Sequence, residues 1–144
     1  MHDPIDVLKS LAEISRDGEA GFKTAAEAAT DARVKSTLTT ASTRCAEGAV
    51  ELETEITKLG GEATHSGTVA GTMHRAWTNL KATVTGGDDK AVLSECERGE
   101  DAAKAAYEKA LEEDLPLDVA MLVRRQYQGV RHNHDLIKSM RDAA

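Results

Sequence analysis

The chain has 144 residues, a length that suits one domain with a single packed core. Alanine occurs 23 times, Leu, Ile, Val and Phe together occur 26 times, and aromatic residues make up 3% of the chain, which argues against a β-sandwich or β-barrel. A net charge of −7 without a basic cluster argues against nucleic-acid binding. No apolar run approaches the ~18 residues of a membrane span, and the N-terminus does not resemble a secretory signal, so we expect a cytoplasmic protein with no membrane partner.

Apolar residues at helical spacing predict two long helices in residues 3–59. The first begins at Asp3-Pro4, a capping residue followed by a proline that the first turn tolerates, and it breaks near Thr30-Asp31. The second ends at Gly60-Gly61, because glycine favours the end of a helix. The residues expected to face the core are Leu8, Leu11, Ile14, Gly18, Phe22, Ala25 and Ala29, then Val34, Leu38, Ala41, Cys45, Ala49, Leu52, Ile56 and Leu59.

Residues 60–88 are predicted to form a crossover that contains a short amphipathic helix. Its apolar side carries Val69, Met73, Trp77, Leu80 and Val84. We expect Trp77 to anchor this segment against the bundle, whereas an exposed Trp77 would indicate a surface for a protein partner. Alanine-rich outer faces would also suit a homodimer.

Two further helices are predicted between Gly86-Gly87 and residue 140, with a turn at Leu115-Pro116. Gln126 and Asn133 lie on the apolar stripe of the last helix. Buried amides require hydrogen-bond partners, so these residues predict a small polar network inside the bundle. The other stripe residues are Val92, Cys96, Gly99, Ala103, Ala106 and Ala110, then Val119, Leu122, Val130, Ile137 and Met140.

The predicted fold class is all-α: a single ferritin-like four-helix-bundle domain over residues 1–144, in which two antiparallel hairpins are joined by one long crossover. The hairpins match when the chain is shifted by 81 residues without gaps. Gly18-Glu19 then falls on Gly99-Glu100, and Gly48 falls on Gly129. We therefore interpret residues 3–59 and 84–140 as an internal repeat whose equivalent residues face each other across the bundle.

Five short motifs add a resemblance: Arg16-Asp17-Gly18-Glu19, Leu59-Gly60-Gly61, His74-Arg75-Ala76-Trp77, Glu95-Cys96-Glu97-Arg98-Gly99-Glu100-Asp101 and His134-Asp135-Leu136-Ile137-Lys138. Together they resemble a small, functionally uncharacterised bacterial four-helix-bundle family, a domain of unknown function within the ferritin-like superfamily. The resemblance covers nearly the whole chain. It implies the fold, but it implies no established activity.

A ferritin-like di-iron site takes one Glu from each of two helices and a Glu-x-x-His pair from each of the other two. Glu19 and Glu100 suit the single-Glu helices. The second helix has no histidine. Its nearest candidate ligands, Glu47 and Glu51, fall on Gln128 and His132 under the repeat. The sequence therefore predicts at most a non-standard site for iron or another divalent metal ion, formed by Glu19, Glu51, Glu100 and His132, with Glu47 and Gln128 nearby.

The same residues also have structural interpretations. Carboxylates of the second helix lie off the apolar stripe with basic residues in helical reach, as in an exposed ladder of ion pairs formed by Glu47, Glu51, Glu55, Arg44 and Lys58. The glycines before Glu19 and Glu100 could serve close helix packing or make room around a site. Both interpretations stay open at this point.

The histidine and cysteine residues also have both a structural and a functional interpretation. We expect a partly buried imidazole at His132 or His134, held by a carboxylate such as Asp135, with metal ligation or proton transfer as the alternative. Cys45 and Cys96 lie on core stripes, which favours reduced, buried thiols over a disulfide.

Two functions therefore fit the sequence, and we favour the first. One is a non-enzymatic bundle with a structural, stress-related or protein-interaction role and a degenerate metal site. The other is an iron-binding or other metal-binding protein with weak ferroxidase activity at the four ligands above. The sequence contains no motif for an activated nucleophile, a phosphate-binding loop or a dinucleotide.

Overall fold

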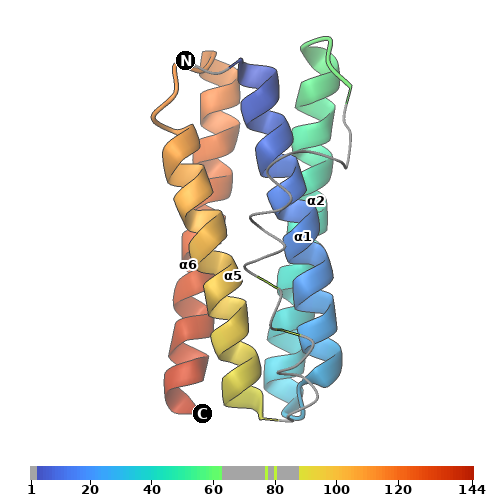
Figure 1. Ribbon diagram of the computed structural model, residues 1–144, viewed down its shortest axis with the longest axis vertical. Coiled ribbons are helices and arrows are strands. Elements are labelled where there is room, and N and C mark those ends of the chain that lie inside the picture. Colours follow the sequence, from blue (N-terminus) through green and yellow to red (C-terminus); the bar gives the residue numbers. More distant parts are fainter. Residues whose placement is uncertain (1–2, 63–76, 78–79, 81–87) are drawn as a thin grey trace.

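The computed structural model describes residues 3–62, 77, 80 and 88–144, and the regular structure within these residues is helical throughout. Four long helices run side by side: α1 (Pro4–Ala28), α2 (Ala32–Lys58), α5 (Asp89–Ala110) and α6 (Leu117–Ala143) (Figure 1). Their bounds lie close to those expected from the apolar periodicity. None of these helices combines the length and the apolar character that crossing a membrane requires.

Aspartate side chains set the starts of three helices. Asp3, Asp31 and Asp88 each accept a hydrogen bond of 2.8–2.9 Å from a backbone N–H of the following turn. Asp89 accepts two more, at 2.8 and 2.9 Å, from backbone N–H groups between α1 and α2, and so ties the start of α5 to that turn. After α2 the backbone of Gly60 takes a φ of 89°, a left-handed conformation that favours glycine and ends the helix.

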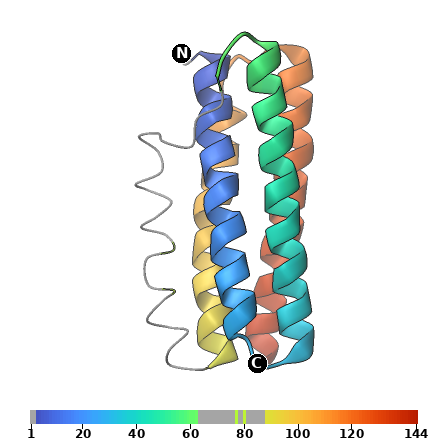
Figure 2. The same ribbon diagram turned by 90° about the vertical axis from the view of Figure 1, so that its right-hand side faces the viewer.

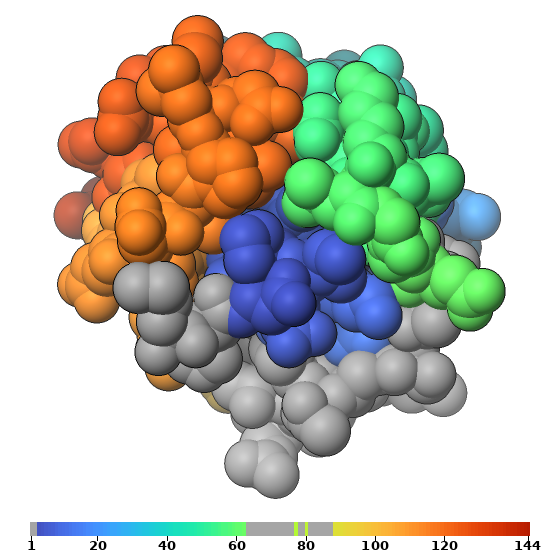
Figure 3. Space-filling view, turned by 90° about the horizontal axis from the view of Figure 1, so that it is seen from above, coloured from blue at the N-terminus to red at the C-terminus, as the bar shows by residue number. Residues whose placement is uncertain are grey.

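The helices form two hairpins, α1–α2 and α5–α6, which lie side by side with α1 against α5 (Figures 1 and 2). The end of α2 and the start of α5 lie at opposite ends of the bundle (Figure 1). Seen from above, the start of α1 lies between the end of α2 and the turn that joins α5 to α6 (Figure 3). The hairpins therefore meet mainly through α1 and α5, whereas α2 and α6 approach each other much less.

The core consists largely of the apolar stripes that the sequence predicts. Every predicted core residue of the first helix is buried, and Leu38, Leu52 and Ile56 of α2 have no exposed surface. Leu59 was predicted on the same stripe, and that prediction is wrong: the residue is 38% exposed. The reason is its position at the C-terminal cap of α2, beyond the packed face of the helix.

Trp77 joins the two hairpins. Its residue is 9% exposed, and the indole lies so close to Gly21 of α1 and Gly99 of α5 that an added Cβ would come within 2.5 and 2.3 Å of the ring. Phe22 packs against the same indole edge to face, with ring centroids 5.1 Å apart. The predicted anchoring role of Trp77 is confirmed, and its burial contradicts the alternative of an exposed tryptophan that contacts a partner. The other bulky residues predicted on this segment lie outside the described residues, except for Leu80, which is buried.

Replacing Gly99 with alanine tests the contact with Trp77. The new Cβ would overlap the indole, so we expect Gly99→Ala to lower the free energy of unfolding by about 1–3 kcal/mol, as overpacked cores do. The fluorescence of Trp77, the single tryptophan of the chain, should shift in the same variant. Urea titrations followed by circular dichroism and by fluorescence measure both effects.

Gly129→Ala is the matched control, because it also places alanine inside a helix but its Cβ would meet no atom within 4 Å. The higher helix propensity of alanine should then raise the free energy of unfolding by up to ~1 kcal/mol. The same change in stability in both variants would contradict the role assigned to the indole contact.

Candidate functional site

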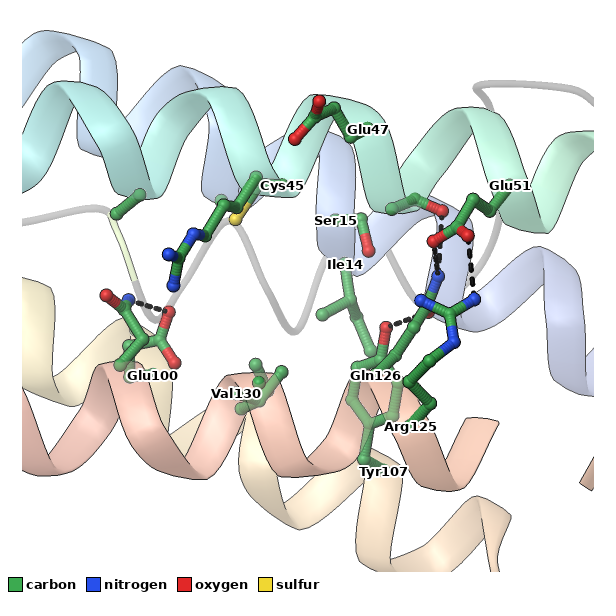
Figure 4. Close-up of a pocket in the computed structure, with 18 of the residues that line it drawn as sticks. Ile14, Ser15, Cys45, Glu47, Glu51, Glu100, Tyr107, Arg125, Gln126 and Val130 are labelled. Atoms are coloured by element: carbon green, nitrogen blue, oxygen red, sulfur yellow. Dashed lines mark hydrogen bonds and ion pairs between the residues drawn. The ribbon is translucent and has the colours of Figure 1, made fainter. Parts of the chain in front are cut away.

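A cavity of about 250 Å³ lies in the middle of the bundle, on the side where α2 and α6 face each other. All four helices and Trp77 contribute to its wall. The wall is mostly apolar, with Ile14, Ala103 and Val130 among its residues, and its polar groups gather at two ends (Figure 4). Exposed residues of α2 and α6 form the mouth.

Each long helix places one glycine in the cavity wall, and the two pairs related by the predicted repeat serve different purposes. An added Cβ at Gly18 or Gly99 would lie 2.9 or 2.3 Å from a neighbouring side chain, so these glycines permit close packing. A Cβ at Gly48 would lie 3.5 Å from its nearest neighbour, and one at Gly129 would meet nothing within 4 Å. Close packing therefore explains the glycines before the two matched glutamates, and the open space lies beside the other pair.

Glu100 is the deeply buried charged group of the cavity wall. It is 5% exposed, and its Oε1 accepts a hydrogen bond of 3.1 Å from Asn133 Nδ2. Its Oε2 is buried and has no hydrogen-bond partner among the described residues, and the same holds for the indole N–H of Trp77. Burial raises the pKa of Glu100 to about 7, although the hydrogen bond from Asn133 and the nearby His134 act in the opposite direction. Two residues that line this cavity thus each contain one buried polar atom without a partner in the described part of the chain.

A hydrogen-bonded network occupies the other end of the cavity. Tyr107 Oη donates to Gln126 Oε1 at 2.8 Å, and Gln126 Nε2 donates to Glu51 Oε1 at 3.1 Å. Arg125 completes the network with an ion pair of 2.7 Å to Glu51 Oε2, which links α6 to α2 (Figure 4). Burial raises the pKa of Tyr107, which keeps its phenol protonated as a donor. The internal polar network predicted from Gln126 and Asn133 is confirmed.

The structure brings two of the four predicted metal ligands to the cavity, and these two lie at its opposite ends: Glu51 and Glu100 (Figure 4). Glu19 does not line the cavity, because its Oε1 pairs with Arg16 Nη1 at 3.0 Å and its side chain is 36% exposed. His132 is exposed on α6.

The residues expected beside the metal lie at the surface as well. Glu47 is exposed at the mouth of the cavity, and Gln128 is exposed outside it. Of the predicted surface ladder, Glu55 pairs with Lys58 at 3.7 Å, but the Glu55 side chain is only 17% exposed, and Glu51 pairs with Arg125 of α6 instead. Within residues 3–62, 77, 80 and 88–144, no group of three or more His, Cys, Asp or Glu side chains could hold a metal ion. A site made of all four ligands stays a prediction.

A difference between the two hairpins explains why Glu19 and Glu100 are not alike. Arg16, one turn before Glu19, pairs with Glu19 and Glu53 at 3.0 and 2.8 Å and holds the Glu19 carboxylate toward the surface. Under the predicted repeat, Glu97 takes the position of Arg16, and it pairs with an arginine of α6 instead. Glu100 therefore has no arginine at the position that Arg16 takes before Glu19, and it is buried. The sequence already shows this difference, because the residue three positions before the glutamate is Arg16 in the first hairpin and Glu97 in the second.

His134 and the cysteines have the structural roles that the sequence favours. The imidazole of His134 is 13% exposed, with Nε2 at 2.7 Å from Asp101 and Nδ1 at 3.3 Å from Asp135. Both cysteines are free. Burial raises the pKa of the Cys45 and Cys96 thiols, so both stay protonated and are poor nucleophiles at neutral pH.

The fold and its interior define a four-helix protein with a mostly apolar cavity between its hairpins. Residues 3–113 match the family described as Domain of unknown function (DUF2383), and because this match covers most of the chain, the protein belongs to that family. The matched range includes Trp77 and Glu100, whereas Gln126 and Asn133 of α6 lie beyond it. No curated protein matches the sequence.

The variant Glu100→Gln tests whether burial of this carboxylate opposes folding. Its pKa rises from an ordinary value of 4.5 to about 7 in the folded protein. As the pH rises from about 4.5 to 7, the unfolded chain releases a proton that the folded chain retains, so this group lowers stability by about 3 kcal/mol above pH 7. Glutamine keeps an acceptor for Asn133 and does not ionise. The variant should therefore be more stable than the natural protein by about 2–3 kcal/mol at pH 8 and equally stable at pH 4.

Urea unfolding at pH 4 and pH 8 measures the difference. A stability gap that is the same at both pH values would mean that Glu100 is solvated and does not titrate as described.

Proposed function

We propose that this protein is a non-enzymatic binding protein, built as a ferritin-like four-helix bundle with a degenerate metal site, whose central cavity holds a small ligand. The observation that carries the proposal is a cavity of about 250 Å³ lined by Glu100, a buried acid whose Oε2 has no hydrogen-bond partner among the described residues. Binding in the cavity would underlie the structural, stress-related or protein-interaction role that the sequence favours.

The size and lining of the cavity support ligand binding. An apolar cavity of about 150 Å³ is sufficient to bind benzene, so the present cavity can take a substituted ring or a branched chain. Glycine inside a helix costs about 1 kcal/mol relative to alanine. Gly129 lies on the exposed side of α6 at the mouth of the cavity, where a Cβ would meet no atom within 4 Å.

The ion pairs of the predicted metal ligands support the loss of a metal site. Arg16 pairs with Glu19, and Arg125 pairs with Glu51, so each carboxylate already has a cation. A metal-binding protein is the second candidate function, because the free oxygen of Glu100 would accept a cation. It would require Glu19 and His132 to turn into the cavity.

An anaerobic Fe(II) titration of the metal-free protein, followed by exposure to air, decides between these functions. We expect no more binding than in a denatured control, because two of the four ligands are held in ion pairs. Bound metal per chain and near-ultraviolet absorbance are the measurements. Tight binding of one or two irons per chain, lost in both Glu19→Ala and Glu100→Ala, would reverse the assignment.

A substitution that fills the cavity tests ligand binding directly. Gly129 is an exposed residue at the mouth of the cavity, so leucine at this position would place a side chain across the entrance. We expect benzyl alcohol, benzylamine or benzoate to shift the ¹⁵N–¹H resonances of cavity residues on α2 and α6, and we expect Gly129→Leu to abolish these shifts while the helices stay folded.

Gln128→Leu is the matched control, since it adds the same side chain at the adjacent exposed position of α6, which does not line the cavity. It should leave the shifts unchanged. Failure of all three probes to bind, or binding that survives in Gly129→Leu, would rule out the cavity as a ligand site.

A further inference from the structure

We infer that the cavity is selective for organic cations: its ligand is a small amine, protonated on nitrogen, whose ammonium group binds Glu100 and whose apolar body fills the space between α2 and α6. This inference rests on the proposed function of the cavity and adds the chemical class of the ligand.

The unsatisfied oxygen of Glu100 determines the charge of the ligand. A buried carboxylate is costly unless it is paired and hydrogen-bonded. Asn133 donates to Oε1 at 3.1 Å, but within the described part of the chain nothing donates to Oε2. An ammonium group supplies N–H donors and a positive charge together, and such charge-assisted hydrogen bonds are about twice as strong as neutral ones.

The wall beside Glu100 fits an organic body better than a bare metal ion. Val130 and Ile14 lie between Glu100 and the network of Gln126 and provide hydrocarbon there, although the hydroxyl of Ser15 lies in the same part of the wall (Figure 4). Trp77 lines the same space, and an aromatic ring attracts a cation that lies over its face. A calcium ion needs six to eight oxygen ligands, and the described residues offer no cluster of even three ligating side chains.

The charged residues at the mouth of the cavity do not determine whether the ligand is a cation or an anion. Arg44 and Glu47 are both exposed there and have opposite charges. Arg125 is neutralised by its ion pair of 2.7 Å with Glu51. Selection must therefore come from the interior, where Glu100 is the unpaired acid.

The indole N–H of Trp77 is the competing feature, because it needs an acceptor. A hydroxyl or a carboxylate would satisfy it, whereas an ammonium group would not. Three probes of the same ring size separate the two groups: benzylamine suits Glu100, benzoate suits Trp77, and benzyl alcohol can bond to either.

Titratable groups on every surrounding helix bear on the pH dependence. They are Glu19 on α1, Cys45 and Arg44 on α2, Cys96, Asp101 and Tyr107 on α5, and His134 on α6. Burial raises the pKa of both thiols and of the phenol, so these three stay neutral between pH 6 and 8. Because the pKa of Glu100 is about 7, protonation should weaken benzylamine binding roughly tenfold from pH 8 to pH 6.

The experiment is a titration of the full chain with benzylamine, benzyl alcohol and benzoate at pH 8, followed through the fluorescence of Trp77 and by calorimetry. We expect benzylamine to bind at least tenfold more tightly than benzyl alcohol, and benzoate to bind most weakly. Glu100→Gln should weaken benzylamine binding about 10- to 100-fold, as loss of a charged hydrogen bond does, and should change the affinity for benzyl alcohol by less than about twofold. Glu47→Gln removes an exposed carboxylate at the mouth and should change neither.

Each outcome has one meaning. Equal affinity for benzylamine and benzyl alcohol, or tighter binding of benzoate, would overturn the inference while leaving the cavity as a binding site. An unchanged preference for benzylamine in Glu100→Gln would overturn it as well. If none of the three probes binds and Gly129→Leu changes nothing, both the inference and the proposed function fail.

Discussion

The contact of the Trp77 indole with Gly21 and Gly99 connects the two hairpins of a bundle that has few large side chains. Alanine and glycine allow α1 and α5 to approach, but they provide little apolar surface, and the indole supplies much of what is missing. Gly99 directly precedes Glu100, so the residue that receives the indole also fixes the backbone of the buried acid. Because Trp77 forms part of the cavity wall as well, the fold and the candidate site depend on the same contact.

Two hairpins of similar sequence do not give a symmetrical interior. Glu19 and Glu100 are equivalent under the predicted repeat, yet Glu19 is paired near the surface, whereas Glu100 is buried and its Oε2 has no partner among the described residues. The two hairpins differ at one nearby position, where Arg16 pairs with Glu19 in the first and Glu97 pairs with Arg141 in the second. Equivalent positions in the two hairpins therefore carry opposite charges and have different partners.

The sequence predicts the helices and most of the core, because periodicity and capping depend on residues that are near each other in the chain. It does not predict the state of the site residues, since these depend on partners far along the chain. Glu51 pairs with Arg125, 74 positions away, and not with the nearby Arg44. Arg16 likewise reaches Glu53 across 37 positions. Gln126 and Asn133 were informative because a polar residue on an apolar stripe must have a partner, whichever residue that partner is.

Two residues that line the cavity oppose folding. Gly129 gives up helix propensity beside open volume, and Glu100 ionises in a place where burial raises its pKa. Alanine at one position and glutamine at the other would remove these penalties without disturbing the hairpins. A bundle that served only as a scaffold would gain from both replacements. A bundle that binds a small cation needs both features, because the glycine leaves room for the ligand and the carboxylate is neutralised once the ligand is bound.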